Sequence, residues 1–267
     1  MQFQSTVQCV TATETALHPI LDERGNGVAR ITLNRPARRN AINAAMLEAL
    51  AAALGSAQRD PDVRVIVLTA AGEVFSSGDD LDELPATAAD AVAVKKMVTR
   101  LQDITRHIML GRCPVVCAVR GWAIGAGASW PLNADFTLWS ETARLRFPEA
   151  RHALFPSGGA TWLLADRLGD QQALEILLSG EALDTQRLLA LGVCADTLAD
   201  DTLETALEAR VHSLLTLPPA TLEAYKRVQA ARRTEPLEAA LAAEAEQMIA
   251  AVARLTAAGA FPQVGGA

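Results

Sequence analysis

The alternation of apolar and polar residues predicts a chain that passes repeatedly between strand and helix. Residues 28–33 alternate apolar and polar side chains, as in a strand with one buried face, and residues 44–54 are rich in the helix formers Ala, Leu and Met. Further segments follow the same rhythm: we expect strands at 63–68, 114–119 and 136–139 and near Leu145, and a helix from about 88 to 109. This order predicts an α/β fold.

From Thr161 onward the pattern becomes helical. Glycines and prolines separate the expected helices, which are 171–178, 185–190, 201–215, 218–232 and 236–255. We therefore expect a core domain over residues 1–200 and a helical C-terminal region over residues 201–267, packed on the core or on a neighbouring subunit. The Ala-rich surface of the last two helices is more apolar than a single core domain would cover, which favours an oligomer.

Composition places the chain among globular proteins and makes some partners unfavourable. With 267 residues, of which 50% are hydrophobic and 21% charged, it is long enough for one large domain with a real core. Its 24 Lys and Arg against 31 Asp and Glu give a net charge of −7, which disfavours nucleic acid and anionic membrane surfaces as partners. No apolar run approaches the roughly 18 residues of a membrane span, and residues 1–26 lack a secretory pattern, so we expect a soluble, cytoplasmic protein.

Several common reactive sites are missing from the sequence. The four cysteines (Cys9, Cys113, Cys117 and Cys194) do not form a disulfide framework and are expected to be structural thiols, and the four histidines are too dispersed to suggest a metal site. Neither a phosphate-binding loop, nor a serine nucleophile elbow, nor a zinc-binding H-E-x-x-H is present. A dinucleotide-binding loop at Gly125 to Gly127 is a weak alternative, because Trp130 stands where the third glycine belongs.

Two glycine-rich loops remain as candidates for chemistry. One comprises residues 75–81, after the strand at 63–68, and the other residues 121–127, between an apolar strand and a short helix. Backbone N–H groups at the start of a helix lack internal partners and lie at the positive end of its dipole. Together the loops could supply two N–H donors to one developing negative oxygen. The alternative, that the glycines only permit tight turns, is left open by the spacing alone.

Taken in order, several segments resemble the successive motifs of the enoyl-CoA hydratase/isomerase (crotonase) superfamily. The resemblance covers roughly residues 28–195 and is carried by Ile31-Thr32-Leu33-Asn34-Arg35-Pro36, Arg39-Asn40-Ala41-Ile42-Asn43, Phe75-Ser76-Ser77-Gly78-Asp79-Asp80-Leu81, residues 114–127, Phe147-Pro148-Glu149 and Pro156-Ser157-Gly158-Gly159-Ala160-Thr161. It implies a crotonase-like spiral of ββα repeats with a helical C-terminal trimerisation region. It also implies a homotrimer or dimer of trimers, and a coenzyme A thioester as substrate with no further cofactor and no metal.

The resemblance also assigns binding roles. The oxyanion hole for the thioester carbonyl is expected from the backbone N–H groups of Asp79 and Ala126. Residues 38–41 match the stretch whose backbone receives the adenine, so Arg38 and Ala41 are expected to bind coenzyme A, with Arg38 near phosphate oxygens. Lys226 resembles a family lysine near the CoA phosphates, and a solvated surface charge is the equal alternative for it.

The acid and base positions depart from the family's hydratases, which carry two glutamates. Glu149 occupies the second of these positions, whereas Ser129 occupies the first. Hydration asks one group to activate water and another to hold or donate a proton, but moving a double bond can use a single carboxylate. We therefore expect enoyl-CoA isomerisation with Glu149 as proton shuttle and Ser129 at most orienting water or substrate. The alternatives are a hydratase, a hydroxycinnamoyl-CoA hydratase-lyase, or a non-catalytic CoA-binding homologue.

Asp79 is a second departure, since the family usually has a small or apolar residue at this position. Its carboxylate could recognise a polar acyl group, act as a second proton carrier, or point into solvent, and the sequence does not fix its direction.

Overall fold

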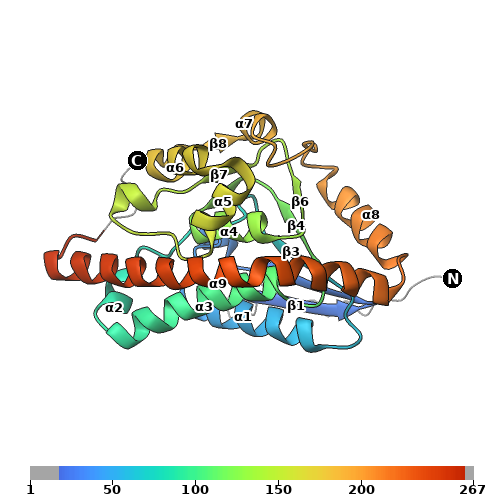
Figure 1. Cartoon of the computed structure of the whole chain (residues 1–267), viewed down its shortest axis with the longest axis horizontal. Helices are drawn as coiled ribbons and strands as arrows, with labels where there is room; N and C mark the ends of the chain where they lie inside the picture. The colour runs from blue at the N-terminus through green and yellow to red at the C-terminus, as the bar shows by residue number, and fades with distance from the viewer. Residues whose placement is uncertain (1–17, 262–267) are drawn as a thin grey trace.

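A five-stranded sheet forms the centre of the protein. The computed structural model describes residues 18–261, and in it the strands lie in the order β1-β2-β3-β4-β6 (Figure 1). β1 and β2 pair antiparallel, whereas β2, β3, β4 and β6 are parallel to one another. The bounds are Ile20–Gly25, Val28–Leu33, Val65–Ala70, Val115–Val119 and Phe136–Trp139.

A smaller sheet runs beside the first and gives the fold its repeat. It contains β5 (Trp122–Ile124), β7 (Arg144–Arg146) and β8 (Leu183–Asp184), and an isolated bridge joins Ser76 to Ala123 at its edge. After each of β3, β4 and β6 the chain therefore crosses to the second layer before it enters helical structure. This confirms the predicted α/β spiral of ββα repeats.

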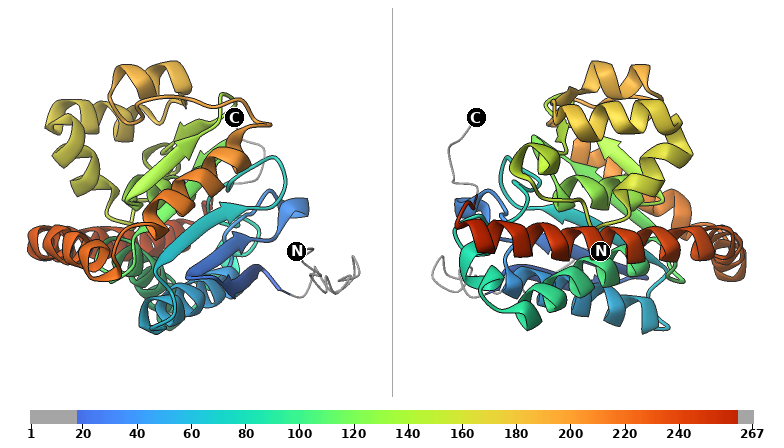
Figure 2. Two further views of the ribbon diagram at one scale, coloured as in Figure 1. Left: turned by 90° about the vertical axis from the view of Figure 1, so that its right-hand side faces the viewer. Right: turned by 60° about the vertical axis from the view of Figure 1, so that its left-hand side comes forward.

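Helices cover both faces of the large sheet. Ile66 and Leu68 of β3 belong to the same apolar core as α1 and α3, whereas Val65 and Val67 pack against α8. Neighbouring residues of a strand point to opposite faces, so α8 lies across the sheet from α1 and α3 (Figure 2). The helices are α1 (Ala44–Arg59), α2 (Leu84–Ala88), α3 (Ala91–Met109), α4 (Ala126–Asn133), α5 (Ala160–Leu168), α6 (Asp170–Ser179), α7 (Thr185–Ala190), α8 (Leu203–Leu215) and α9 (Pro219–Ala258), with short 3₁₀ turns η2 (Pro36–Arg38) and η3 (Glu149–His152).

The C-terminal helix corrects one prediction. The sequence predicts two helices that meet before Pro236, but α9 is a single helix of 40 residues with Pro236 inside it. Proline removes its own N–H donor and strains the preceding turn, which usually ends a helix. Figure 1 shows α9 as one continuous helix, and the side chains of Leu237 and Leu241, both fully buried against the core, hold the turn after Pro236 in helical register. Burial of the apolar face therefore outweighs the local effect of proline.

Other predictions have mixed outcomes. Cys113, Cys117 and Cys194 are buried free thiols, as predicted, and Cys9 lies outside the described residues. The predicted boundary near residue 200 stays a prediction, since α8 packs on β3, β4 and β6, and α9 packs on α2, α3 and α5.

Within residues 18–261, no helix combines the length and apolarity of a membrane span, and no three potential metal ligands cluster. Cytoplasmic localisation stays a prediction.

Candidate active site

The two glycine-rich loops predicted from the sequence lie side by side. The Ser76 N–H donates to the Trp122 carbonyl at 2.9 Å, and the Ile124 N–H donates to the Ser76 carbonyl at 3.0 Å. The chains approach so closely that a Cβ on Gly127 would lie 2.5 Å from the Ser76 Cβ. The second strand layer therefore fixes the ends of both loops against each other.

The backbone N–H groups of Asp79 and Ala126 are both available. Asp79 is held by its neighbours, because Ile42 donates to the Gly78 carbonyl at 2.8 Å and accepts from the Asp80 N–H at 2.9 Å. Ala126 is the first residue of α4, so its N–H has no partner within the helix. In the described part of the chain, neither N–H donates to another protein group. This arrangement suits the predicted oxyanion hole.

Glycine is required immediately before each donor. Gly78 has φ +80° and Gly125 has φ +57°, a region that residues with a side chain rarely adopt. A Cβ on Gly78 would lie 3.0 Å from the Ile124 carbonyl oxygen, and one on Gly125 would lie 3.1 Å from Oε1 of Glu149. The glycines thus turn the two N–H groups outward and also let the Glu149 carboxyl lie against the backbone beside Ala126.

Glu149 begins the turn η3 and is buried. Within residues 18–261 its Oε2 has no hydrogen-bond partner. Burial raises the pKa of this carboxyl to about 8, and the nearby negative charges of Asp79 and Glu244 contribute to the rise. A carboxyl with a pKa near neutrality and one free oxygen is well suited to accept and return a proton.

Three adjoining cavities surround these groups. The first, which we call the site cavity, has a volume of about 160 Å³ and is lined by Asp79, Gly125, Arg146, Glu149 and His152 among others. A second, the helix chamber, lies between α1, α2 and α3 and shares Asp79 with the site cavity. A third, the rear chamber, lies against α5 and α6 and shares Glu149 with it. The two carboxyls therefore stand where the site cavity meets its two neighbours.

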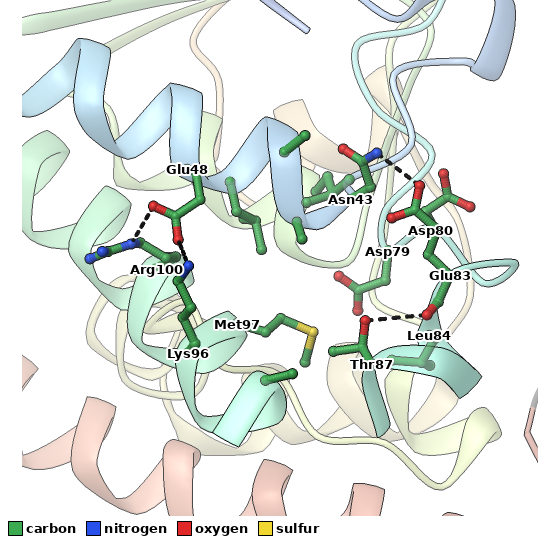
Figure 3. A pocket seen from close by; sticks show the side chains of 15 residues that line it. Asn43, Glu48, Asp79, Asp80, Glu83, Leu84, Thr87, Lys96, Met97 and Arg100 are labelled. Atoms are coloured by element: carbon green, nitrogen blue, oxygen red, sulfur yellow. Dashed lines mark hydrogen bonds and ion pairs between the residues drawn. The ribbon is translucent and has the colours of Figure 1, made fainter. Parts of the chain in front are cut away.

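The helix chamber has a volume of about 350 Å³ and mostly apolar walls. Figure 3 shows the Asp79 side chain directed into it, towards Met97. Glu48 lies at the opposite end of the chamber, where its carboxylate forms ion pairs with Lys96 at 2.9 Å and Arg100 at 3.0 Å. The cations of this chamber are thus already paired with a carboxylate of the protein, away from Asp79.

Asp79 and Asp80 are adjacent but have opposite surroundings. The Asp80 carboxylate is buried and paired with Arg35 at 3.0 Å and Arg38 at 3.2 Å. The Asp79 carboxyl forms no hydrogen bond or ion pair with any residue that the structure describes, and burial raises its pKa to about 6. The residue is partly exposed and lines two cavities, and the role of its carboxylate stays a prediction.

Ser129 lies on α4, after the second glycine-rich loop, but its side chain is not part of the site cavity. Its side chain is 2% exposed, its hydroxyl donates to the Gly125 carbonyl at 3.4 Å, and it lies beneath Gly158, where a Cβ would come within 3.0 Å of the Ser129 Cβ. It does not line the site cavity. The side chain is part of the packing between α4 and the segment before α5, and the structure does not bring it to Glu149.

Of the predicted CoA-binding residues, Arg38 and Ala41 lie close to the site. Arg38 is half exposed and pairs with Asp80 and Asp82, and the Ala41 N–H donates to the Arg38 carbonyl at 3.0 Å. The next residue, Ile42, lines the helix chamber. An exposed guanidinium beside the cavity can approach a phosphate, and CoA binding by Arg38 and Ala41 stays a prediction.

Lys226 requires a correction. It is 4% exposed, and its ammonium donates to Asp135 at 2.6 Å and to the Ile108 carbonyl at 2.7 Å. Burial lowers the pKa of this ammonium, although Asp135 opposes the change. Both sequence interpretations, the phosphate ligand and the solvated charge, assume an accessible side chain. The lysine instead anchors α9 to the core, and we do not retain it as a CoA ligand.

Glu244 is a residue that sequence reasoning missed. This buried carboxylate on α9 accepts hydrogen bonds from the N–H groups of Gly159 at 2.7 Å and Thr161 at 2.9 Å, where α5 begins. Gly159 occupies the N-cap position and has no side chain to cap the helix. The one sign of this contact in the sequence is Gly159 at the N-cap of α5, because glycine has no side chain that could accept a hydrogen bond from the first N–H groups of the helix.

Known proteins resemble this chain in sequence. The family model described as enoyl-CoA hydratase/isomerase matches residues 23–256. The 2,3-dehydroadipyl-CoA hydratase of Escherichia coli is 33% identical over 231 residues, 84% of this chain and 87% of that protein. The 1,2-epoxyphenylacetyl-CoA isomerase of Escherichia coli is 31% identical over 224 residues, 83% of this chain and 86% of that protein.

Solved structures agree with the sequence relatives. A crystal structure of an enoyl-CoA hydratase/isomerase from Mycobacterium paratuberculosis matches with a TM-score of 0.84 at 28% identity, covering 88% of this chain and 94% of that one. The family match extends over most of the chain, and it includes both loops, Glu149 and most of α9. This protein belongs to the enoyl-CoA hydratase/isomerase family, whose enzymes act on CoA thioesters.

Proposed function

We propose that the protein moves the double bond of an enoyl-CoA thioester, with Glu149 as the proton carrier. The ionised Glu149 carboxylate removes a proton from carbon 2 of a 3-enoyl thioester. The electron pair moves towards the carbonyl, and the N–H groups of Asp79 and Ala126 stabilise the resulting enolate oxygen. Glu149 then returns the proton at carbon 4, which leaves the double bond between carbons 2 and 3.

The observation that carries this proposal is that Glu149, whose buried Oε2 has no hydrogen-bond partner among the described residues, lines the same cavity as the oxyanion loops. Only a carboxyl that faces the substrate can shuttle a proton, so this placement also disfavours a non-catalytic CoA-binding homologue. The position of Ser129, bonded to Gly125 and outside the cavity lining, disfavours a hydratase-lyase that depends on its hydroxyl.

Hydration of a 2-enoyl-CoA is the second candidate. It is favoured by the Asp79 carboxyl, which lines the same cavity as Glu149 and could hold a water molecule. Relatives carry both kinds of name, a hydratase acting on 2,3-dehydroadipyl-CoA and an isomerase acting on 1,2-epoxyphenylacetyl-CoA. The two reactions are separable because hydration adds the mass of one water molecule to the product and isomerisation adds none.

The test uses purified protein with short 3-enoyl-CoA and 2-enoyl-CoA substrates, followed by absorbance of the conjugated thioester and by mass spectrometry. We expect the 3-enoyl substrate to be converted without change of mass, and Glu149→Gln to lower turnover by about 10²- to 10⁴-fold. Glu246→Gln, on the exposed face of α9, is the matched control. Efficient hydration with no isomerisation would replace the first proposal with the second.

We further propose that Arg38 and Ala41 contact the coenzyme A portion of the substrate and that the protein assembles as a homotrimer or a dimer of trimers. The exposed Arg38 guanidinium beside the helix chamber supports the first statement. Exposed Tyr225 and Val228, one turn apart on α9, support the second.

A further inference from the structure

Among the residues that the structure describes, the Asp79 carboxyl has no protein partner in the helix chamber. The residue is only partly exposed, and a carboxylate with restricted access to water is stabilised by hydrogen bonds or a counter-charge. The neighbouring Asp80 meets that requirement with Arg35 and Arg38, and Glu48 across the chamber meets it with Lys96 and Arg100. Among the described residues, no donor reaches the side chain of Asp79.

The position of this carboxyl relates it to the acyl group of the substrate. In the proposed function, which this inference rests on, the N–H of Asp79 holds the thioester oxygen. The carboxyl of the same residue is only a few bonds away and projects into the helix chamber (Figure 3). An acyl chain that leaves the oxyanion hole towards this chamber must therefore pass the Asp79 carboxyl within its first few carbons.

The rear chamber is the less suitable place for the chain. It adjoins the site cavity through Glu149 and Leu154, so the catalytic carboxyl stands between it and the thioester. The helix chamber instead opens beside one of the two oxyanion donors. The apolar walls formed by Ile42, Leu84 and Met97 accommodate the methylene groups of a chain.

We infer that Asp79 selects acyl groups that carry a hydroxyl on the first few carbons beyond the thioester, and that it discriminates against unsubstituted chains. A plain chain would displace water from the carboxylate and return no hydrogen bond, whereas a hydroxyl donates one to it. An ammonium group is less suitable, because Lys96 and Arg100 line the same chamber. The substrate class is therefore a hydroxylated enoyl-CoA.

The test measures binding separately from catalysis. Pentanoyl-CoA and its derivatives hydroxylated on the fourth or fifth carbon can neither isomerise nor reverse a hydration at carbon 3, so calorimetry on the wild-type protein gives their affinities directly. We expect at least one hydroxylated derivative to bind about 10²-fold more tightly than pentanoyl-CoA. The Asp79→Ala substitution keeps the backbone N–H and should bring that ratio close to one, through weaker binding of the hydroxylated ligand and tighter binding of the plain one.

Two further variants make the result specific. Asp79→Asn keeps the shape and a hydrogen-bond acceptor, so it should retain part of the preference if Asp79→Ala fails to fold. Glu149→Gln should keep the full preference, and would do so even if the protein proved not to be an isomerase. Two results would overturn the inference. One is equal affinity of the wild type for plain and hydroxylated chains. The other is an Asp79→Ala variant that keeps the binding ratio but loses turnover, which would make Asp79 a proton carrier.

Discussion

Burial of Glu149 predicts a pH dependence of folding stability that its replacement removes. The pKa of this carboxyl is about 8 in the folded protein, against 4.5 for an ordinary glutamate. Below pH 4.5 both the folded and the unfolded chain hold the proton, so this group makes no pH-dependent contribution. Between these values only the folded protein holds it. A rise in pH therefore favours the unfolded chain, and the loss of stability is complete above about pH 8.

The magnitude follows from the same two values. Each unit of pKa difference corresponds to about 1.4 kcal/mol, so the wild type should lose roughly 5 kcal/mol relative to a variant that cannot ionise at this position. Glu149→Gln is such a variant. Its buried amide costs about 1–3 kcal/mol if it lacks a partner, but that cost is the same at every pH. The unfolding free energy of the variant should therefore rise relative to that of the wild type by about 1.4 kcal/mol per pH unit, until about pH 8.

The assay is urea unfolding of wild type and Glu149→Gln at fixed protein concentration, at several pH values between about 5 and 9. The difference in unfolding free energy is the measured quantity, because contributions from groups common to both proteins cancel. Turnover should follow the opposite course, since removal of the carbon 2 proton needs the ionised carboxylate and kcat/KM should rise as pH approaches about 8. Stability curves that run parallel at all pH values would refute the buried, proton-holding Glu149.

Three further outcomes follow from the described contacts. Ser129→Ala should reduce isomerisation far less than the roughly 10²-fold expected for loss of an acid or base, and an equal loss would restore the hydroxyl to the mechanism. Lys226→Met leaves the partly buried Asp135 without its counter-charge, although the Val115 N–H still donates to it, and should destabilise the protein by up to about 3 kcal/mol in urea unfolding, with KM for the CoA substrate unchanged; a raised KM at unchanged stability would contradict this. Light scattering should give the mass of a trimer or hexamer, and Tyr225→Asp with Val228→Asp should release monomers; a monomeric wild type would exclude the assembly.

Local pattern was sufficient where one face of an element is buried. The predicted strand 28–33 matches the observed β2, whose burial alternates along its length, because such apolar patterning indicates a strand without knowledge of its partners; the predicted strand 136–139 matches β6. β1 was not predicted, since Ile20 is its one buried residue and the other five residues are partly or fully exposed. The break predicted at Pro236 failed for the opposite reason, since the burial of Leu237 and Leu241 depends on contacts with the core that no local rule contains.

In the candidate site, too, features fixed by local sequence could be predicted and features that depend on distant contacts could not. The two loops and their glycines could be predicted because the geometry of a strand followed by a loop and a helix fixes where backbone donors point, whereas Glu149 was assigned by its position in the family motif. The direction of a side chain could not. Asp79 and Asp80 are neighbours in sequence, yet only Asp80 finds arginines, and Lys226 meets Asp135 across 91 positions of sequence. Ser129 was assigned by family position, and its packing against Gly158 depends on how α4 meets the chain before α5.

The C-terminal helix takes part in the site as well as in the expected assembly. Glycine at position 159 has φ +84° and leaves α5 without a capping side chain of its own. Glu244 of α9 supplies the acceptor that a serine or aspartate at the N-cap would otherwise provide. The segment that Glu244 holds follows η3, the turn that begins with Glu149. The negative charge of Glu244 also contributes to the raised pKa of Glu149. A displacement of α9 would therefore release the start of α5 and remove one of the charges that raise the pKa of Glu149, which couples the position of α9 to the protonation of that carboxyl.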